Sequence, residues 1–178
     1  ERAQEIIRQF NWDGAVESTE GDYTMVVDAN LGALKTDYYM QRSLAKEVEP
    51  CLEESDKLCH TVSIEYRNTA LEASPLNNAY RSYTRVLLPE EAFVTGVTNI
   101  ERDGEVDYST EYGKKIAGFQ VEVPFNDQKT VEVSYTTPIY DSYSWMIQKQ
   151  PGIDPLPVTF QYGDWTTSQT VDLIDTIK

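Results

Sequence analysis

The chain has 178 residues, with 30 Asp and Glu against 15 Lys and Arg, so its formal net charge is −15. Hydrophobic residues make up 40% and charged residues 25%, a balance that is typical of a folded globular chain and excludes intrinsic disorder. The sequence has no Lys or Arg block and no run of about 18 apolar residues, so we expect no nucleic-acid partner and no direct membrane insertion.

The first segment predicts a short amphipathic helix. Ala3, Ile6, Ile7 and Phe10 recur at the spacing of one helical face, and polar residues fill the positions between them. The Asn-Trp-Asp-Gly segment at 11–14 is expected to end this helix. Because no capping residue precedes the helix, the sequence indicates a piece of a longer protein.

Strands are expected through the rest of the chain. Residues 23–27 predict a first strand, and 30–48 predict a loop followed by a strand. From Val62 onward apolar and polar residues alternate with a period of two, as in strands that bury one face. Nine strands are expected there, at 61–68, 80–88, 92–100, 105–112, 115–123, 130–136, 142–150, 158–162 and 170–174. The dipeptides at 103–104 (Asp-Gly) and 126–127 (Asn-Asp) are each predicted to close a hairpin.

This alternation and the regular spacing of the expected strands predict a mainly β fold. We expect an antiparallel β-sandwich with immunoglobulin-like character, preceded by a short helix and an extended α/β leader. Residues 1–58 are assigned to the leader, which packs on the sandwich, and residues 59–178 to the sandwich domain. No linker rich in Gly, Ser or Pro separates the two.

The two cysteines are the strongest indication of compartment. Cys51 and Cys59 bracket an acidic segment, and pairing them would add about 2.5 kcal/mol by the chain-entropy relation and indicate an oxidising environment. The alternative is two unpaired thiols, which the acidic flanks disfavour because they oppose burial. A zinc site would need more ligands than these thiols and His60 provide, so no metal and no cofactor is expected.

The sequence contains none of the common catalytic motifs. It has no P-loop, no Gly-x-Ser-x-Gly elbow, no His-Glu-x-x-His pair and no EF-hand loop. Because the chain has 30 acidic residues, some pair of carboxylates will always resemble a catalytic pair. Such a pair is therefore no indication of acid–base catalysis in this sequence. No catalytic residue is therefore assigned.

A polar group after the first strand is a candidate binding site, formed by Asn30, Lys35, Asp37 and Tyr38. These residues could bind a ligand or partner where the leader meets the sandwich. Alternatively, Asn30 closes an Asx turn, Asp37 or Thr36 provides a cap and Tyr38 anchors the next strand. A third alternative joins Lys35 to an Asn or Asp through an isopeptide bond.

A second candidate is a strand on which aromatic and cationic side chains alternate. It carries Tyr80, Arg81, Tyr83 and Arg85, with Tyr83 and Arg85 on one face and Tyr80 on the other. The structural interpretation is Arg stacked on Tyr or paired with a neighbouring Glu. The functional alternative is carbohydrate binding, because 12 Tyr and 3 Trp could stack on sugar rings.

Several short segments also occur in a characteristic order. They are 12–14 (Trp-Asp-Gly), 30–39 (Asn-Leu-Gly-Ala-Leu-Lys-Thr-Asp-Tyr-Tyr), 66–69 (Tyr-Arg-Asn-Thr), 80–86 (Tyr-Arg-Ser-Tyr-Thr-Arg-Val), 118–124 (Gly-Phe-Gln-Val-Glu-Val-Pro) and 147–152 (Ile-Gln-Lys-Gln-Pro-Gly). In this order they resemble the C-terminal part of a bacterial family named domain-of-unknown-function family 4012. The resemblance implies a membrane segment upstream of this sequence and a location outside the cytoplasm, at the cell surface. It implies no known reaction.

Together these features favour a non-enzymatic extracytoplasmic module of a membrane-anchored bacterial surface protein, with a structural or recognition role at the cell envelope. One alternative is a glycan-binding module that works with a cell-wall or polysaccharide assembly enzyme. Another is a catalytic domain for glycan or lipid-linked transfer whose site lies mainly upstream of this sequence. The expected partners are the upstream half of the same polypeptide and either a cell-envelope glycan or another surface protein.

Overall fold

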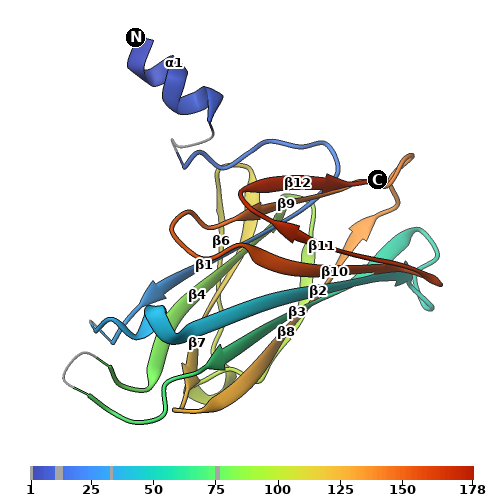
Figure 1. Cartoon of the computed structure of the whole chain (residues 1–178). Coiled ribbons are helices and arrows are strands. Elements are labelled where there is room, and N and C mark those ends of the chain that lie inside the picture. The colour runs from blue at the N-terminus through green and yellow to red at the C-terminus, as the bar shows by residue number, and fades with distance from the viewer. Residues whose placement is uncertain (1, 11–13, 33, 75–76) are drawn as a thin grey trace.

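Two β-sheets packed together and one short N-terminal helix make up the fold (Figure 1). The structure is a computed structural model that describes residues 2–10, 14–32, 34–74 and 77–178. The predicted mainly β, sandwich-like architecture with a preceding helix is confirmed.

In the described ranges, twelve strands form the two sheets. The first sheet contains β1 (Asp22–Asn30), β4 (Tyr80–Pro89), β6 (Asp107–Glu111), β7 (Lys114–Val123), β9 (Trp145–Lys149) and β12 (Ile174–Ile177). The second contains β2 (Met40–Pro50), β3 (Lys57–Asn68), β5 (Phe93–Thr98), β8 (Asp127–Pro138), β10 (Leu156–Tyr162) and β11 (Trp165–Val171). The helix α1 (Arg2–Gln9) precedes them, and the 3₁₀ turns η1 (Thr36–Tyr39) and η2 (Arg102–Gly104) lie in loops.

Both sheets are mixed, which corrects the expectation of an antiparallel sandwich. The strand orders are β12-β9-β1-β4-β7-β6 and β11-β10-β2-β3-β8-β5. β1 pairs in parallel with β9, and β2 pairs in parallel with β10. Parallel neighbouring strands need a long connection between them. Here more than 100 residues separate β1 from β9 and β2 from β10 in the sequence. β1 is therefore an interior strand of the first sheet, and β2 is an interior strand of the second. Residues 22–50, which were expected to belong to the leader, thus contribute strands to the sandwich itself.

The core lies between the sheets, where the alternating residues meet. Along β3, Val62, Ile64 and Tyr66 are at most 2% exposed, and on the paired strand β8 Val131 and Val133 are fully buried. Each such side chain gains roughly 1.5–3 kcal/mol by leaving water. The period-two pattern thus identifies the buried face correctly.

Neither predicted hairpin forms. The turn around Asp103 and Gly104 joins β5 in the second sheet to β6 in the first, and the turn at Asn126 joins β7 in the first to β8 in the second. Asp103 and Asn126 adopt positive φ values of 55° and 48°, so the chain does turn at both predicted places. A turn residue reverses the chain, but the buried face of the next strand decides which sheet that strand enters.

The hairpins that do form connect β2 to β3, β6 to β7, and β10 to β11. The last one was missed, because a single strand was expected at 170–174 where β11 and β12 lie. Gly163, with a φ of +56°, and Asp164 make its two-residue turn between Tyr162 and Trp165.

The helix α1 forms as predicted, but its apolar face does not belong to the core. In Figure 1 it stands apart from the two sheets, and Ile6 is 46% exposed. The expected end of the helix falls partly on residues 11–13, which lie outside the described residues. Among the helices described, none has the length and apolar character needed to span a membrane.

Candidate functional site

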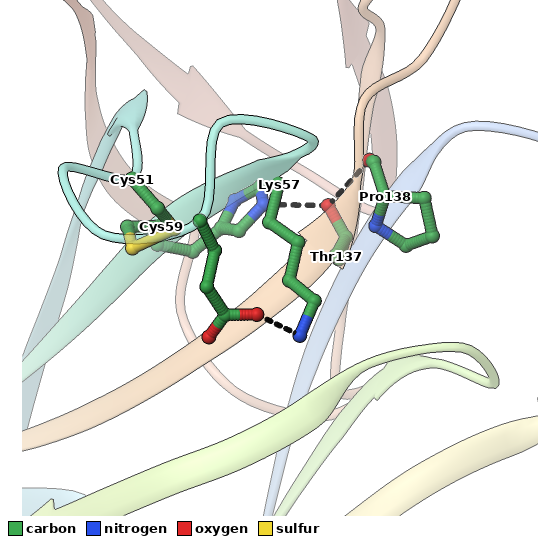
Figure 2. Close-up of a disulfide and its surroundings, with 7 residues drawn as sticks. Cys51, Lys57, Cys59, Thr137 and Pro138 are labelled. Atoms are coloured by element: carbon green, nitrogen blue, oxygen red, sulfur yellow. Dashed lines mark hydrogen bonds and ion pairs between the residues drawn. A yellow bond between two sulfur atoms is a disulfide. The ribbon is translucent and has the colours of Figure 1, made fainter.

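The predicted disulfide is present and closes the β2–β3 hairpin (Figure 2). Cys51 and Cys59 have Cα atoms 5.1 Å apart. The acidic loop between them is exposed, and Lys57 forms an ion pair with Glu54 at its base. The apolar residue of this loop, Leu52, is fully exposed, so the disulfide ties together two strands whose connecting loop does not pack on the core.

The first predicted polar group does gather at one place, where β1 ends and η1 leads into β2. Asn30 Oδ1 accepts a hydrogen bond from the Gly32 amide at 2.7 Å, which is the predicted Asx turn. Asn30 Nδ2 donates to Asp37 Oδ2 at 2.7 Å and to the Leu34 carbonyl at 3.1 Å. Asn30 therefore holds the loop in shape, and Asp37 faces it.

The other structural roles predicted for this group are wrong. Lys35 occupies the N-cap position of η1, and no side chain caps that turn, so neither Asp37 nor Thr36 is a cap. Tyr38 is 87% exposed and therefore does not anchor β2. Lys35 is also exposed, whereas an isopeptide bond needs a lysine that is shielded from water.

Arg42, which the sequence did not single out, joins this group to the interior. Its Nε donates to Asp28 Oδ2 at 2.8 Å, and its Nη2 donates to Asp37 Oδ1 at 3.0 Å and to the Tyr80 hydroxyl at 2.9 Å. The Arg42 and Asp28 side chains are only 8% and 4% exposed. Burial opposes the charge of Arg42, but the Asp28 carboxylate and the Tyr80 hydroxyl outweigh it and hold the arginine pKa above its usual range.

An open hollow of about 480 Å³ lies over this arginine. Its lining residues are Lys35, Asp37, Tyr38, Met40, Arg42, Gly152, Ile153 and Asp154. The lining thus combines an exposed aromatic ring with donors and acceptors of both charges. Such a surface can stack on and hydrogen-bond to a polar ligand.

The second predicted group does not form one site. Tyr80 is fully buried and contacts Arg42, whereas Arg81, Tyr83 and Arg85 lie on the outer face of the first sheet. Their partners are Glu122 for Arg81 at 2.9 Å, Asp107 for Tyr83 at 2.9 Å and Glu111 for Arg85 at 2.7 Å. These contacts match the interpretation as cross-strand pairs, and Tyr80 alone of the four contacts a residue that lines the hollow, Arg42.

A buried polar cluster between the sheets, which we call the interior cluster, was missed by the sequence reasoning. It consists of Asp22, Lys46, His60, Tyr135 and Tyr143. Asp22 and Lys46 are fully buried and form an ion pair. Tyr135 and Tyr143 donate hydrogen bonds to the two Asp22 oxygens, at 3.0 and 2.5 Å, and His60 Nδ1 lies 3.3 Å from Oδ2.

The charges in the interior cluster depend on one another. Burial by itself would raise the pKa of Asp22, but the Lys46 ammonium and His60 hold it well below its usual range. Burial lowers the pKa of Lys46 to about 8 in spite of the opposing effect of Asp22. Burial and the Lys46 charge also lower the pKa of His60, although Asp22 opposes them. Lys46 is the one cation in direct contact with the Asp22 carboxylate within the described part of the chain.

No metal centre is found among the described residues, since no three His, Cys, Asp or Glu side chains there are close enough to hold an ion. The described residues thus provide two polar sites of different character. The hollow over Arg42 is open to solvent, and the interior cluster is closed.

The comparisons with known proteins add little. No protein-family model and no curated protein matches the sequence. Among solved structures, leukotriene A4 hydrolase from Saccharomyces cerevisiae is similar over 71% of this chain, with 11% identity and a TM-score of 0.35. The match spans 24% of the hydrolase chain, and a likeness this remote carries no argument about function.

Proposed function

We propose that this chain is a non-enzymatic extracytoplasmic module of a membrane-anchored bacterial surface protein, with a structural or recognition role at the cell envelope. The observation that carries the proposal is the disulfide between Cys51 and Cys59. Disulfides persist in oxidising compartments and are rare where thiols are kept reduced. The strong net negative charge supports it further, because it keeps an exposed module soluble and repels anionic lipid and nucleic acid.

The location can be tested in cells that make the natural full-length product. Intact cells are treated with an amine-reactive biotin that does not cross membranes, and peptides of this chain are then identified by mass spectrometry. We expect labelling of the exposed Lys35 and none of the buried Lys46. Labelling of Lys35 only after the cells are lysed would refute an extracytoplasmic location.

The thiol state gives an independent test in the same cells. Alkylation before and after reduction should modify Cys51 and Cys59 only after reduction. Alkylation of both cysteines in unreduced samples would remove the observation on which the compartment depends.

A glycan-binding role is a second candidate, and the hollow over Arg42 favours it. Tyr38 presents an 87% exposed ring at this hollow, beside Asp37, Arg42 and Asp154. Sugar rings stack on aromatic faces while their hydroxyls bond to charged side chains, and the hollow offers both. A recognition role would then consist of binding an envelope glycan.

Titration with cell-wall fragments separates this role from a purely structural one. If the hollow binds glycan, Tyr38→Ala should lower the affinity by about 10-fold or more, which is the effect of roughly 1.4 kcal/mol at one contact. Tyr112→Ala is the matched control, because Tyr112 is also exposed (76%) but lies in the β6–β7 turn at the opposite end of the first sheet. No binding by the unmodified chain, or an equal loss in both variants, would exclude this site.

A further inference from the structure

The interior cluster contains a lysine and an aspartate held in contact where water is excluded. Lys46 projects from β2 in the second sheet and Asp22 from the start of β1 in the first, and both side chains have no exposed surface. The Lys46 ammonium also lies over the rings of Tyr135 and Trp145, 5.1 and 5.0 Å from their centroids. Aromatic rings and two sheets therefore enclose the pair on several sides.

Two unit charges in such a place are costly, because the attraction between them only partly offsets their loss of hydration. An amide bond between the same two groups would carry no charge and would still hydrogen-bond through its oxygen. The removal of both charges from the core favours condensation, and the fixed contact replaces a bimolecular encounter by an intramolecular one.

We propose that the Lys46 amine and the Asp22 carboxyl group condense to an intramolecular isopeptide bond that joins the two sheets. The bond forms between Lys46 Nζ and Asp22 Cγ, and one Asp22 oxygen leaves as water. An ammonium and a carboxylate give a neutral amide and one water, so atoms and charge balance without an outside reactant. No oxidation or reduction takes place.

Tyr135 is placed to move the protons for this step. Its hydroxyl accepts a hydrogen bond from Lys46 Nζ and donates one to Asp22 Oδ1 at 3.0 Å. A proton can pass from the ammonium to Tyr135 while the Tyr135 proton passes to Oδ1, which leaves a neutral amine beside a neutral carboxyl group. The amine then attacks Cγ, and its second proton follows the same route to Oδ1, which departs as water.

Tyr143 is placed to stabilise the other oxygen. Its hydroxyl donates to Asp22 Oδ2 at 2.5 Å, where negative charge develops when Cγ becomes tetrahedral. Oδ2 then remains as the amide oxygen. Tyr143 also lines an open hollow of about 620 Å³ together with Gly21 and Ser144, which gives the released water a way out.

The remaining groups that face the pair determine how condensation depends on pH. They are His60 from β3, Tyr135 from β8 and Tyr143 from the β8–β9 loop. The reacting pair, a neutral amine and a neutral carboxyl group, carries the same number of protons as the ammonium and carboxylate from which it forms. Because burial lowers the pKa of Lys46 to about 8, a rise in pH through that value removes this proton and leaves the amine facing a carboxylate, which it does not attack. Condensation should therefore be faster at pH 6 than at pH 9.

Intact-mass measurement of the purified chain tests the proposal directly. After incubation at pH 6, we expect the mass to fall below that of the disulfide-bonded chain by one water, with a crosslinked peptide containing Asp22 and Lys46. An unchanged mass after prolonged incubation would overturn the proposal and leave a plain buried ion pair.

Variants identify the atoms involved. Lys46→Arg keeps the positive charge but should abolish the mass loss, because a guanidinium does not condense with the carboxyl group. Asp22→Asn should lose one ammonia in place of one water. The control Lys114→Arg, at a lysine stacked on Tyr23, should lose water as the unmodified chain does. Loss of water in Lys46→Arg would refute the assignment, and circular dichroism establishes that each variant is folded.

Discussion

Replacing Arg42 by Met tests whether the ion pair beneath the hollow holds the two sheets together. Arg42 lies on β2 in one sheet and Asp28 on β1 in the other, and both side chains are almost completely buried. Arg42→Met keeps most of the packing volume but leaves the Asp28 carboxylate buried without its cationic partner. Tyr66 and Thr84 still donate hydrogen bonds to Asp28 Oδ1, at 2.9 and 2.7 Å, but neither carries a charge.

Removing one partner of a buried ion pair costs about 3–5 kcal/mol. For a chain of this length each kcal/mol lowers the melting temperature by about 2–4 °C, so we expect a decrease of about 6–20 °C. Urea unfolding followed by circular dichroism should show a lower midpoint with an unchanged slope, because the surface exposed on unfolding is the same.

A double-mutant cycle separates the ion pair from other effects. Arg42→Met combined with Asp28→Asn removes both charges, so its destabilisation should be smaller than the sum of the two single changes by about 1 kcal/mol or more. The control Arg81→Met removes an exposed arginine that pairs with Glu122, and it should change stability by less than about 1 kcal/mol. Equal effects of Arg42→Met and Arg81→Met would refute the reasoning.

Three further changes test other parts of the fold. Replacing Cys51 and Cys59 by Ser should cost about 2.5 kcal/mol by the chain-entropy relation, and a thermal melt should show a midpoint about 5–10 °C lower. Gly21→Ala should cost about 1–3 kcal/mol in urea unfolding, because the new Cβ would lie 2.7 Å from the Ser144 carbonyl oxygen. Because the pKa of His60 is lowered in the fold, the unfolded chain binds more protons below pH 6.5, so stability should fall as the pH drops from 7 to 5.5. His60→Gln should remove most of that fall, since the chain has one His.

Each of these expectations has a result that contradicts it. Serine variants that melt with the unmodified chain would mean that the hairpin needs no covalent closure. Gly96→Ala is the control for Gly21→Ala, because nothing lies within 4 Å of its new Cβ, and equal losses in both would argue against a local clash. A pH profile that is the same with and without His60 would show that another group titrates in this range.

The sequence alone determined the features that depend on neighbouring residues. Alternation along the chain identified most of the strands and their buried faces, because side chains of a strand point to opposite sides at every step, but it merged β11 and β12 into one strand. The two cysteines and their exposed acidic loop were also readable, since both ends of that hairpin lie within a few residues. The Asx turn at Asn30 was identified for the same reason, because its donor is two residues away.

The tertiary structure alone decided which strands pair and which polar groups meet. The turns at Asp103 and Asn126 were visible in the sequence, but the sheet that each next strand enters depends on the apolar faces of strands far along the chain. The interior cluster shows the same limit most clearly, because Tyr135 reaches Asp22 across 113 positions and no local pattern encodes that contact. A buried lysine is recognised only when the groups that enclose it are known, since an isolated lysine in a strand is otherwise expected to face water.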